Sequence, residues 1–322
     1  MNHTITAEDE YPPDHGSGGG GGGGGGAHLH TATAEYLASA DLQPLPRPER
    51  SLAGALRTLA LPPKEVEWYE LFEALDVVRA VAVHHPAALR GGSGGGSSGG
   101  GGGGSGEGLH EVTLAVLRQV DNLRSAIAKN ALMTVGDMCA GVRGGMDPEL
   151  GGVVPALLKR AADTNGFLTE SAEAALTALT AHATPSRLLN ALFHAAASKL
   201  PTVRGRAARA VEGCCAAVGS ARLGQFREMP RLLTVVSRFM DEAQPETRAA
   251  GRRTMLRLVR EGVVGEHQLQ RALSAGDFAK VRKLLERDEV GTSAAAGFVV
   301  TNTHANFHSG SSRFASDPGV RR

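Results

Sequence analysis

Two segments of the sequence place an arginine just after the start of a helical pattern. In "PTVRGRAARAVEGCC" this residue is Arg204, and in "ETRAAGRRTMLRL" it is Arg248. A guanidinium group carries planar donors that match a carboxylate, so a row of such arginines would recognise an acidic partner surface. The alternative is a structural role, in which each arginine pairs with an acidic residue of a neighbouring helical repeat. The sequence leaves both roles open.

Other segments carry an aromatic or polar residue at the matching position. Trp68 is the only tryptophan of the chain, and a place in the core is the alternative; its position before an apolar run that begins at Leu71 favours an exposed indole. One large aromatic followed by guanidinium groups suits a partner that is acidic and has an apolar notch. For residues deeper in their helices, such as Lys129 and Arg206, simple solvation is the alternative. The expected binding row is Trp68, Asn122, Arg124, Lys129, Thr202, Arg204, Arg206, Glu246 and Arg248.

The elements that must position this row are pairs of short helices. Apolar or small residues recur with the spacing i, i+4, i+8 and i+11, which lines one face of a helix. We expect four such buried stripes in the second helices of successive pairs. They are Leu123, Ile127, Ala131, Val135 and Met138; Leu168, Ala172, Leu176 and Leu179; Val203, Ala207, Val211 and Cys214; and Thr247, Gly251, Met255 and Leu258.

The stripes repeat at a regular distance along the chain. Their offsets are about 45, 35 and 44 residues, close to the roughly 40 to 47 residues of a HEAT or armadillo hairpin. The interval before Leu123 is longer, and removing the glycine-rich tract there restores the period. Loop-closure entropy grows slowly with length, so such an insertion is tolerated. We expect a short α-solenoid of about six hairpins, near 50–83, 109–140, 147–182, 184–218, 222–260 and 264–287.

Composition agrees with an all-α fold and suggests the domain limits. Aromatic residues make up only 4% of the chain, and alternating β-branched patterns are almost absent. Polar and glycine-rich stretches cannot bury enough apolar surface to fold. We therefore expect a disordered Gly-rich lead over residues 1–48 and a helical domain over 49–288. A Gly-rich insertion at 91–108 interrupts that domain, and a disordered tail over 289–322 follows it.

Several features argue against a membrane or secreted protein. No apolar run reaches the roughly 18 residues of a membrane span, and the acidic N-terminus lacks the apolar core of a signal peptide. We therefore expect a cytoplasmic protein with no membrane partner. Cys139, Cys214 and Cys215 lack metal-ligand spacing, and we expect them to be buried reduced thiols.

The patterns that suggest catalysis or cofactor binding are weak. The glycine tract contains GxGxxG but lacks a preceding strand and a following Gly-Lys-Ser/Thr, so we expect no phosphate site. His182 and His194 lie in helical segments without a carboxylate partner. We expect no enzymatic activity, no cofactor and no metal site. The histidines of the N-terminal lead have no scaffold to make them ligands, and these are His3, His15, His28 and His30.

Longer stretches of the sequence resemble one known family. "NLRSAIAKNALMTVGDM", "GMDPELGGVVPALLKRAADTNGFLTESAEAALTAL", "ATPSRLLNALFHAAASKLPTVRGRAARAV" and "ETRAAGRRTMLRLV" resemble, in order and spacing, the TOG domain of CLASP and crescerin (TOGARAM) proteins. The resemblance runs from about Pro48 to Arg287, and Trp68 stands where the family has its first-loop tryptophan. It implies a paddle of six HEAT repeats that binds the αβ-tubulin dimer with the loops inside each repeat.

The resemblance also implies a function and a location. A protein of this type would bind tubulin or microtubules and regulate microtubule dynamics, in the cytoplasm and cytoskeleton, at plus ends or in the ciliary axoneme. Thr169 departs from the family, which usually has a basic residue here, so the third loop is expected to add less charge. The alternative function is a HEAT scaffold that binds another protein and no tubulin.

Charge is unevenly distributed along the chain. The formal net charge is +1, yet residues 199–287 carry 18 basic and 9 acidic side chains. A positive half-domain would steer association with an acidic protein such as tubulin. The basic residues alternate with core positions and no aromatic stacking platform accompanies them, so we do not expect nucleic acid as the partner.

Overall fold

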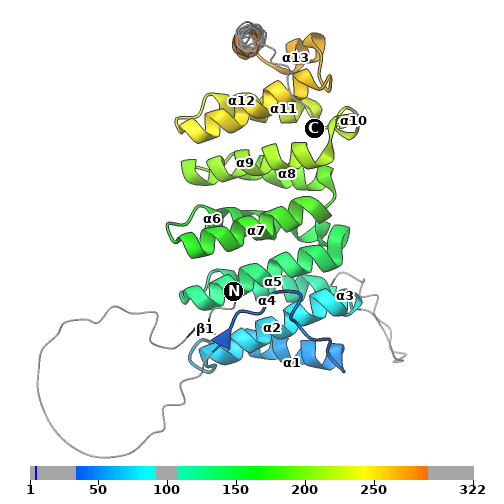
Figure 1. The fold of residues 1–322 in the computed structure, drawn as a ribbon, viewed down its shortest axis with the longest axis vertical. Helices are drawn as coiled ribbons and strands as arrows, with labels where there is room; N and C mark the ends of the chain where they lie inside the picture. The colour runs from blue at the N-terminus through cyan, green and yellow to red at the C-terminus, as the bar shows by residue number, and fades with distance from the viewer. Residues whose placement is uncertain (1–3, 6–33, 92–106, 289–322) are drawn as a thin grey trace, which may run out of the picture.

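The chain folds as a stack of paired antiparallel helices (Figure 1). The computed structural model describes residues 4–5, 34–91 and 107–288. Within these residues the all-α solenoid and its six hairpins are confirmed. The pairs are α1 (Pro48–Ala60) with α2 (Trp68–His84), α4 (Glu107–Val120) with α5 (Ser125–Val142), α6 (Leu150–Ala161) with α7 (Gly166–His182), α8 (Pro185–Ala195) with α9 (Pro201–Val218), α11 (Met229–Met240) with α12 (Pro245–Arg260), and α13 (Glu266–Ala272) with a helix over 275–288.

Short elements connect or flank the pairs. Two short helices, α3 (Pro86–Leu89) and α10 (Ser220–Leu223), and a 3-10 helix, η1 (Arg143–Glu149), join successive hairpins. Near the N-terminus the two-residue strand β1 (Thr4–Ile5) pairs antiparallel with β2 (Ala34–Glu35). None of the helices in the described ranges combines the length and apolarity needed to cross a membrane.

The predicted stripes pack into the core between neighbouring hairpins, although Leu176 and Val203 are only partly buried and Leu123 is an exception. In α5, Ile127, Ala131, Val135 and Met138 are at most 1% exposed. Leu123 is 102% exposed, so its assignment to the stripe is wrong. The helix begins only at Ser125, and Leu123 therefore lies in the turn that precedes it, where helical spacing no longer determines which way a side chain points.

Small residues allow the helices to approach closely. A Cβ added at Gly141 of α5 would lie 2.0 Å from the carbonyl oxygen of Ala82 in α2. A Cβ at Gly251 of α12 would lie 2.9 Å from the backbone nitrogen of Met240 in α11. At both positions only glycine lets the two helices pack backbone against backbone. This accounts for a stable core in a chain that has few aromatic residues.

An extended segment ahead of α1 packs against the solenoid, and we call residues 34–47 the N-terminal strap. Tyr36 is only 6% exposed, and its hydroxyl donates to the carbonyl oxygen of Ala126 at 3.2 Å. The strap runs across α2, as the dark blue segment in Figure 1 shows. The prediction of disorder over residues 1–48 is therefore wrong for 34–47, because buried apolar contacts and hydrogen bonds fix this part.

Most of the other segments predicted to be disordered lie outside the described residues. These are residues 1–3 and 6–33 of the N-terminal lead, most of the Gly-rich insertion and the tail. The four histidines of the lead, His3, His15, His28 and His30, also lie outside the described residues.

A buried arginine fastens the strap to the second helices. Arg79 of α2 is fully buried, and its Nε donates to Asp137 of α5 at 2.8 Å. Its Nη2 donates to the carbonyl oxygen of Leu37 at 2.8 Å, and Ser39 donates to the other oxygen of Asp137 at 2.5 Å. Burial raises the pKa of the adjacent Asp76, which also accepts from Arg79. This network ties the strap, α2 and α5 together.

The three cysteines are buried and free, as predicted. Burial raises the pKa of Cys139, Cys214 and Cys215 to about 12 in each case. Nowhere in the described part of the chain do three or more His, Cys, Asp or Glu side chains gather as metal ligands would.

Candidate functional site

The turns inside the hairpins lie along one edge of the stack, on the left in Figure 1. Each pair of helices runs out to this edge and back, so the start of every second helix is brought into the same row. We call this the loop edge. Its turns are residues 61–67, 121–124, 162–165, 196–200 and 241–244.

Trp68 stands at the loop edge as the first residue of α2. A capping box fixes this helix end, with the Glu67 backbone N–H donating to the Glu70 carboxylate at 2.9 Å. The sequence favours an exposed indole; in the structure the indole is partly buried and packs against the core. The guanidinium carbon of Arg124 lies 6.0 Å from the indole centroid, within cation–π range.

A groove lies between the first two turns of the loop edge, and we call it the Trp68 groove. Its volume is about 690 Å³, and Asn122 and Arg124 line it together with Trp68. Leu61 and Leu123, at its margin, are 43% and 102% exposed. An aromatic ring and two leucines beside cationic groups can take an apolar side chain of an acidic partner. Neither leucine was predicted from the sequence as a site residue, although the location of both in turns is a usable signal.

The second turn is held in place by hydrogen bonds. Asn122 donates to Gln119 at 2.9 Å, and its side-chain oxygen accepts from the backbone N–H of Arg124 at 3.0 Å. From the next hairpin, Arg160 donates to the carbonyl oxygen of Val120 at 2.8 Å. The groove wall therefore needs little ordering when a partner binds, which lowers the entropy cost of association.

A second hollow lies farther along the loop edge, and we call it the Thr202 hollow. Three of the predicted residues meet there, because Thr202 and Arg206 of α9 line it together with Glu246 of α12. Its volume is about 470 Å³, and Gln244 and Pro245 contribute to its wall. Unlike the Trp68 groove, it has no large apolar side chain, so it is suited to polar contacts.

Arg204 and Arg248 make the same contacts with their own turns. The Nη1 of Arg204 donates to the carbonyl oxygens of Ser198 and Lys199 at 2.9 and 3.1 Å. The Nη1 of Arg248 donates to those of Glu242 and Ala243, which are likewise six and five residues earlier. Both arginines therefore hold a turn of the loop edge in place.

Thr169 occupies the equivalent position in α7. Its hydroxyl donates to the carbonyl oxygen of Asp163, six residues earlier, at 3.2 Å. A shorter, neutral side chain thus replaces the arginine contact in the third turn. The hydrogen bond from the Asn165 backbone lowers the pKa of Asp163, and Asn165 itself caps α7 by accepting from Phe167 at 3.0 Å.

Two further residues of the predicted row have partners inside the molecule. The Nζ of Lys129 lies 3.5 Å from the ring centroid of Phe167 and 4.4 Å from that of Tyr36. Burial lowers the pKa of Lys129. Arg206 contacts the Glu173 carboxylate of α7. Of the nine predicted residues, those best placed to meet a partner are Trp68, Asn122 and Arg124 at one groove and Thr202 and Glu246 at the other.

Comparisons with known proteins agree with the fold. The family described as "CLASP N terminal" matches residues 106–262. The mouse protein "TOG array regulator of axonemal microtubules protein 1" is 30% identical over 228 residues, which cover 70% of this chain and 12% of that protein. The Caenorhabditis elegans "Crescerin-like protein che-12" is 28% identical over 152 residues, covering 46% and 12% of the two chains.

A solved structure supports the fold. This structure, described as "Crescerin uses a TOG domain array to regulate microtubules in the primary cilium", matches with a TM-score of 0.51 at 16% identity. The match covers 71% of this chain and 91% of that one. The present chain therefore has the fold of one complete domain, but it corresponds to only about an eighth of the length of the curated relatives.

The stacked hairpins define a HEAT-type α-solenoid whose turns align along one edge. More specifically, the chain carries a TOG domain of the CLASP and crescerin (TOGARAM) family.

Proposed function

We propose that this TOG domain binds αβ-tubulin through its loop edge and so regulates microtubule dynamics, by binding alone and without catalysis or a cofactor. The observation that carries the proposal is the Trp68 groove, where an indole, Arg124 and an exposed leucine form one surface at the end of the stack. The Thr202 hollow is the second contact. The binding domain would comprise residues 34–288, since the strap belongs to it.

The names of the relatives support the type of partner and its location. The mouse relative is named for axonemal microtubules and the solved neighbour for the primary cilium. We infer a cytoskeletal location, with the axoneme favoured over plus ends or the spindle. The excess of basic residues over 199–287 would steer the domain toward an acidic protein, with an association rate that falls as salt rises.

The proposal is tested by size-exclusion chromatography of the full chain with soluble tubulin, at low and at physiological salt. We expect the wild type to co-elute with tubulin. Trp68→Ala should bind tubulin at least about tenfold more weakly. The matched control is Leu114→Ala, because Leu114 is a 47% exposed leucine midway along α4. This variant should bind as the wild type does.

Two results would contradict the proposal. In the first, Trp68→Ala co-elutes as well as the wild type does, and the loop edge is then not the contact. In the second, no co-elution occurs at either salt and no protein pellets with microtubules. This result would favour the alternative, a HEAT scaffold whose partner is not tubulin.

A further inference from the structure

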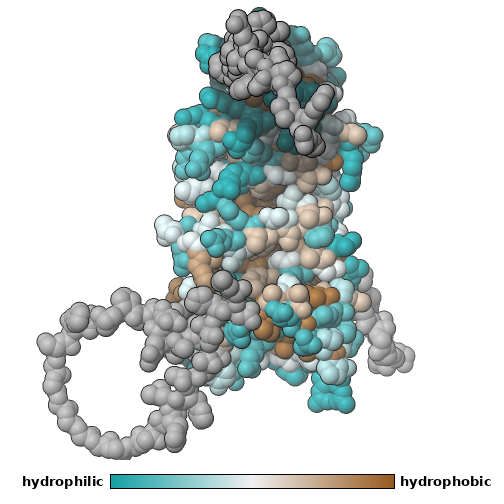
Figure 2. Space-filling view, in the orientation of Figure 1, coloured by the Kyte–Doolittle hydropathy of each residue, from teal (hydrophilic) through white to brown (hydrophobic). Residues whose placement is uncertain are grey.

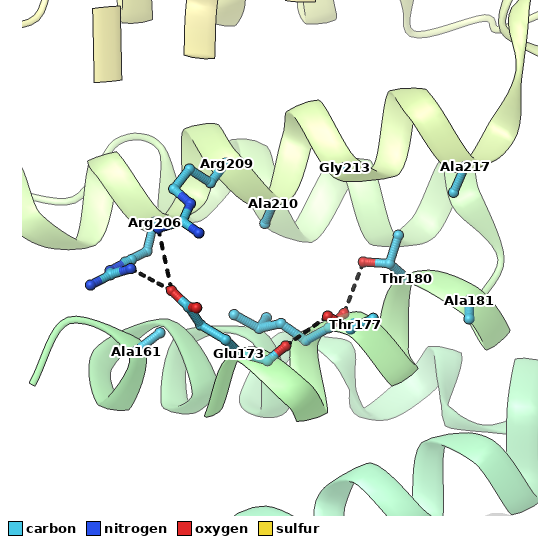
Figure 3. Close-up of a pocket in the computed structure, with 11 residues that line it drawn as sticks. Ala161, Glu173, Thr177, Thr180, Ala181, Arg206, Arg209, Ala210, Gly213 and Ala217 are labelled. Atoms are coloured by element: carbon cyan, nitrogen blue, oxygen red, sulfur yellow. Dashed lines mark hydrogen bonds and ion pairs between the residues drawn. The ribbon is translucent and has the colours of Figure 1, made fainter. Parts of the chain in front are cut away.

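A groove separates α7 from α9 on the face formed by the second helices (Figure 3). Its volume is about 360 Å³, and we call it the α7–α9 groove. On the face shown in Figure 2, pale and apolar side chains cover the middle of the stack, whereas hydrophilic ones dominate over the last repeats. The groove runs along helix faces and is separate from the Trp68 groove, since no residue lines both.

The wall from α9 consists of small residues. Ala210, Gly213 and Ala217 follow one another along the groove (Figure 3). A Cβ built on Gly213 would meet no atom within 4 Å, so the space beside it is open. Such a wall lets the backbone of another chain approach closely, as glycine does at other sites of close backbone contact.

The wall from α7 offers hydrogen-bond acceptors. The hydroxyl of Thr177 donates to the carbonyl oxygen of Glu173 at 2.9 Å, and that of Thr180 donates to Leu176 at 2.8 Å (Figure 3). Each hydroxyl has used its proton and keeps lone pairs toward the groove. These oxygens can accept from the backbone N–H groups of an extended peptide, but they can donate nothing to it.

One end of the groove carries an excess of positive charge. Arg206 and Arg209 both point at Glu173, with Arg209 Nη1 at 3.5 Å from the carboxylate (Figure 3). Two guanidinium groups thus face a single carboxylate. The Arg209 side chain is 50% exposed, so its guanidinium group is free to turn toward a second carboxylate. This end is therefore suited to an acidic side chain of a bound segment.

The same face of the solenoid already holds an extended segment at another place. The N-terminal strap contacts both α2 and α5, where Arg79 donates to the carbonyl oxygen of Leu37 and Asp137 accepts from Ser39. The layer of second helices can therefore hold an extended chain through backbone contacts. The α7–α9 groove lies on the same layer of second helices, two hairpins farther on, and it is lined by small residues and by the arginine pair.

We propose that the α7–α9 groove binds an extended acidic segment of a partner protein, with a carboxylate seated between Arg206 and Arg209. This site goes beyond the proposed tubulin contact at the loop edge. It shares Arg206 and Arg209 with the Thr202 hollow, but it shares no residue with the Trp68 groove, which carries the tubulin proposal. Its ligand class follows from the close glycine and alanine wall, the threonine acceptors and the unbalanced arginine pair.

The test is fluorescence anisotropy of the full chain with a labelled peptide of alternating glycine and glutamate. We expect saturable binding that weakens as salt rises, and much weaker binding of the matched glycine–glutamine peptide. Gly213→Leu places a side chain in the groove and should weaken binding by about tenfold. The matched control is Gly151→Leu, an exposed position of α6 where an added Cβ also meets nothing, and it should bind normally.

Two charge variants give opposite signs and so separate recognition from damage to the fold. Glu173→Gln frees both arginines and should strengthen binding of the glutamate peptide, whereas Arg209→Gln should weaken it. If Gly213→Leu does not fold, these two charge variants test the proposed peptide site in its place. The proposal is overturned if the folded wild type shows no saturable binding, if Gly213→Leu binds normally, or if Glu173→Gln weakens binding. Trp68→Ala should leave peptide binding unchanged, so the two proposals fail independently.

Discussion

Arg204 and Glu242 form a bidentate pair that ties the start of α9 to the turn of the next hairpin. The Nε–Oε1 and Nη2–Oε2 distances are 2.6 and 2.8 Å. The same guanidinium also binds carbonyl oxygens of its own turn, so one side chain fixes two neighbouring turns of the loop edge. Arg248 then binds the backbone of Glu242, which links the pair to α12.

Arg204→Ala should destabilise the domain, because it leaves a carboxylate and two turn carbonyls without their donor. We expect the free energy of unfolding, measured with urea, to fall by about 1–3 kcal/mol. The control is Arg252→Ala, an exposed arginine of α12, which should change it by no more than about 0.5 kcal/mol. Equal effects of the two substitutions would contradict a structural role. Weaker tubulin binding by Arg204→Ala would therefore not by itself establish a contact.

The same pair predicts sensitivity to acid. Hydrogen bonds from Arg204 hold the pKa of Glu242 below its ordinary value of 4.5. A carboxyl whose pKa is lower in the folded protein stabilises the fold above its unfolded pKa, and that stability is lost as pH falls through the folded pKa.

Urea unfolding at a series of pH values from about 6 to 3 tests this expectation. Glu242→Gln should be less stable than the wild type at the upper end, and the difference should shrink as pH falls. In an Arg204→Ala background the substitution should have little effect at any pH. A difference between wild type and Glu242→Gln that grows toward low pH would contradict the assignment.

The buried Arg79 should control the N-terminal strap. Arg79→Met leaves the Asp137 and Asp76 carboxylates without their cation and removes the bond to Leu37, so we expect a loss of about 3 kcal/mol or more. Chymotrypsin should then cut after Tyr36 faster than in the wild type. Arg57→Met, on the exposed face of α1, is the control. Unchanged cleavage in Arg79→Met would show that other contacts hold the strap.

The cysteines should be inert in the folded protein. Burial raises the pKa of all three thiols to about 12, and the thiolate is the species that alkylating agents attack. At about pH 8 we expect iodoacetamide to leave the native chain unlabelled and to modify all three cysteines after unfolding in urea. Mass spectrometry gives the count, and rapid native labelling of any one would contradict its burial.

Much of the architecture was predictable from local patterns. The spacing of Leu168, Ala172, Leu176 and Leu179 depends only on the helical period, and it correctly identified the helix and its inner side. The offset between such stripes identified the stacked hairpins, because each repeat must bury the same kind of face against its neighbour. It follows that the second helices all start along one edge of the stack, and Trp68 and Arg204 lie at two of these starts.

Through-space partners were not predictable in the same way. Tyr36 looked like part of a polar lead because its partners, Phe72, Ala126 and Phe167, are far away in the sequence. Leu123 fitted a helical stripe by its spacing. It is exposed because α5 begins only at Ser125, so Leu123 lies in the preceding turn.

The sequence alone therefore determined the helices, their pairing and the edge on which the polar residues gather, since these follow from periodicity and short connections. The tertiary structure alone decided which of those residues are available to a partner. Arg204 and Lys129 have the same sequence signature as a binding residue. They are instead held by Glu242 and by two aromatic rings, because charge pairing and burial depend on neighbours that only the packed solenoid brings within reach.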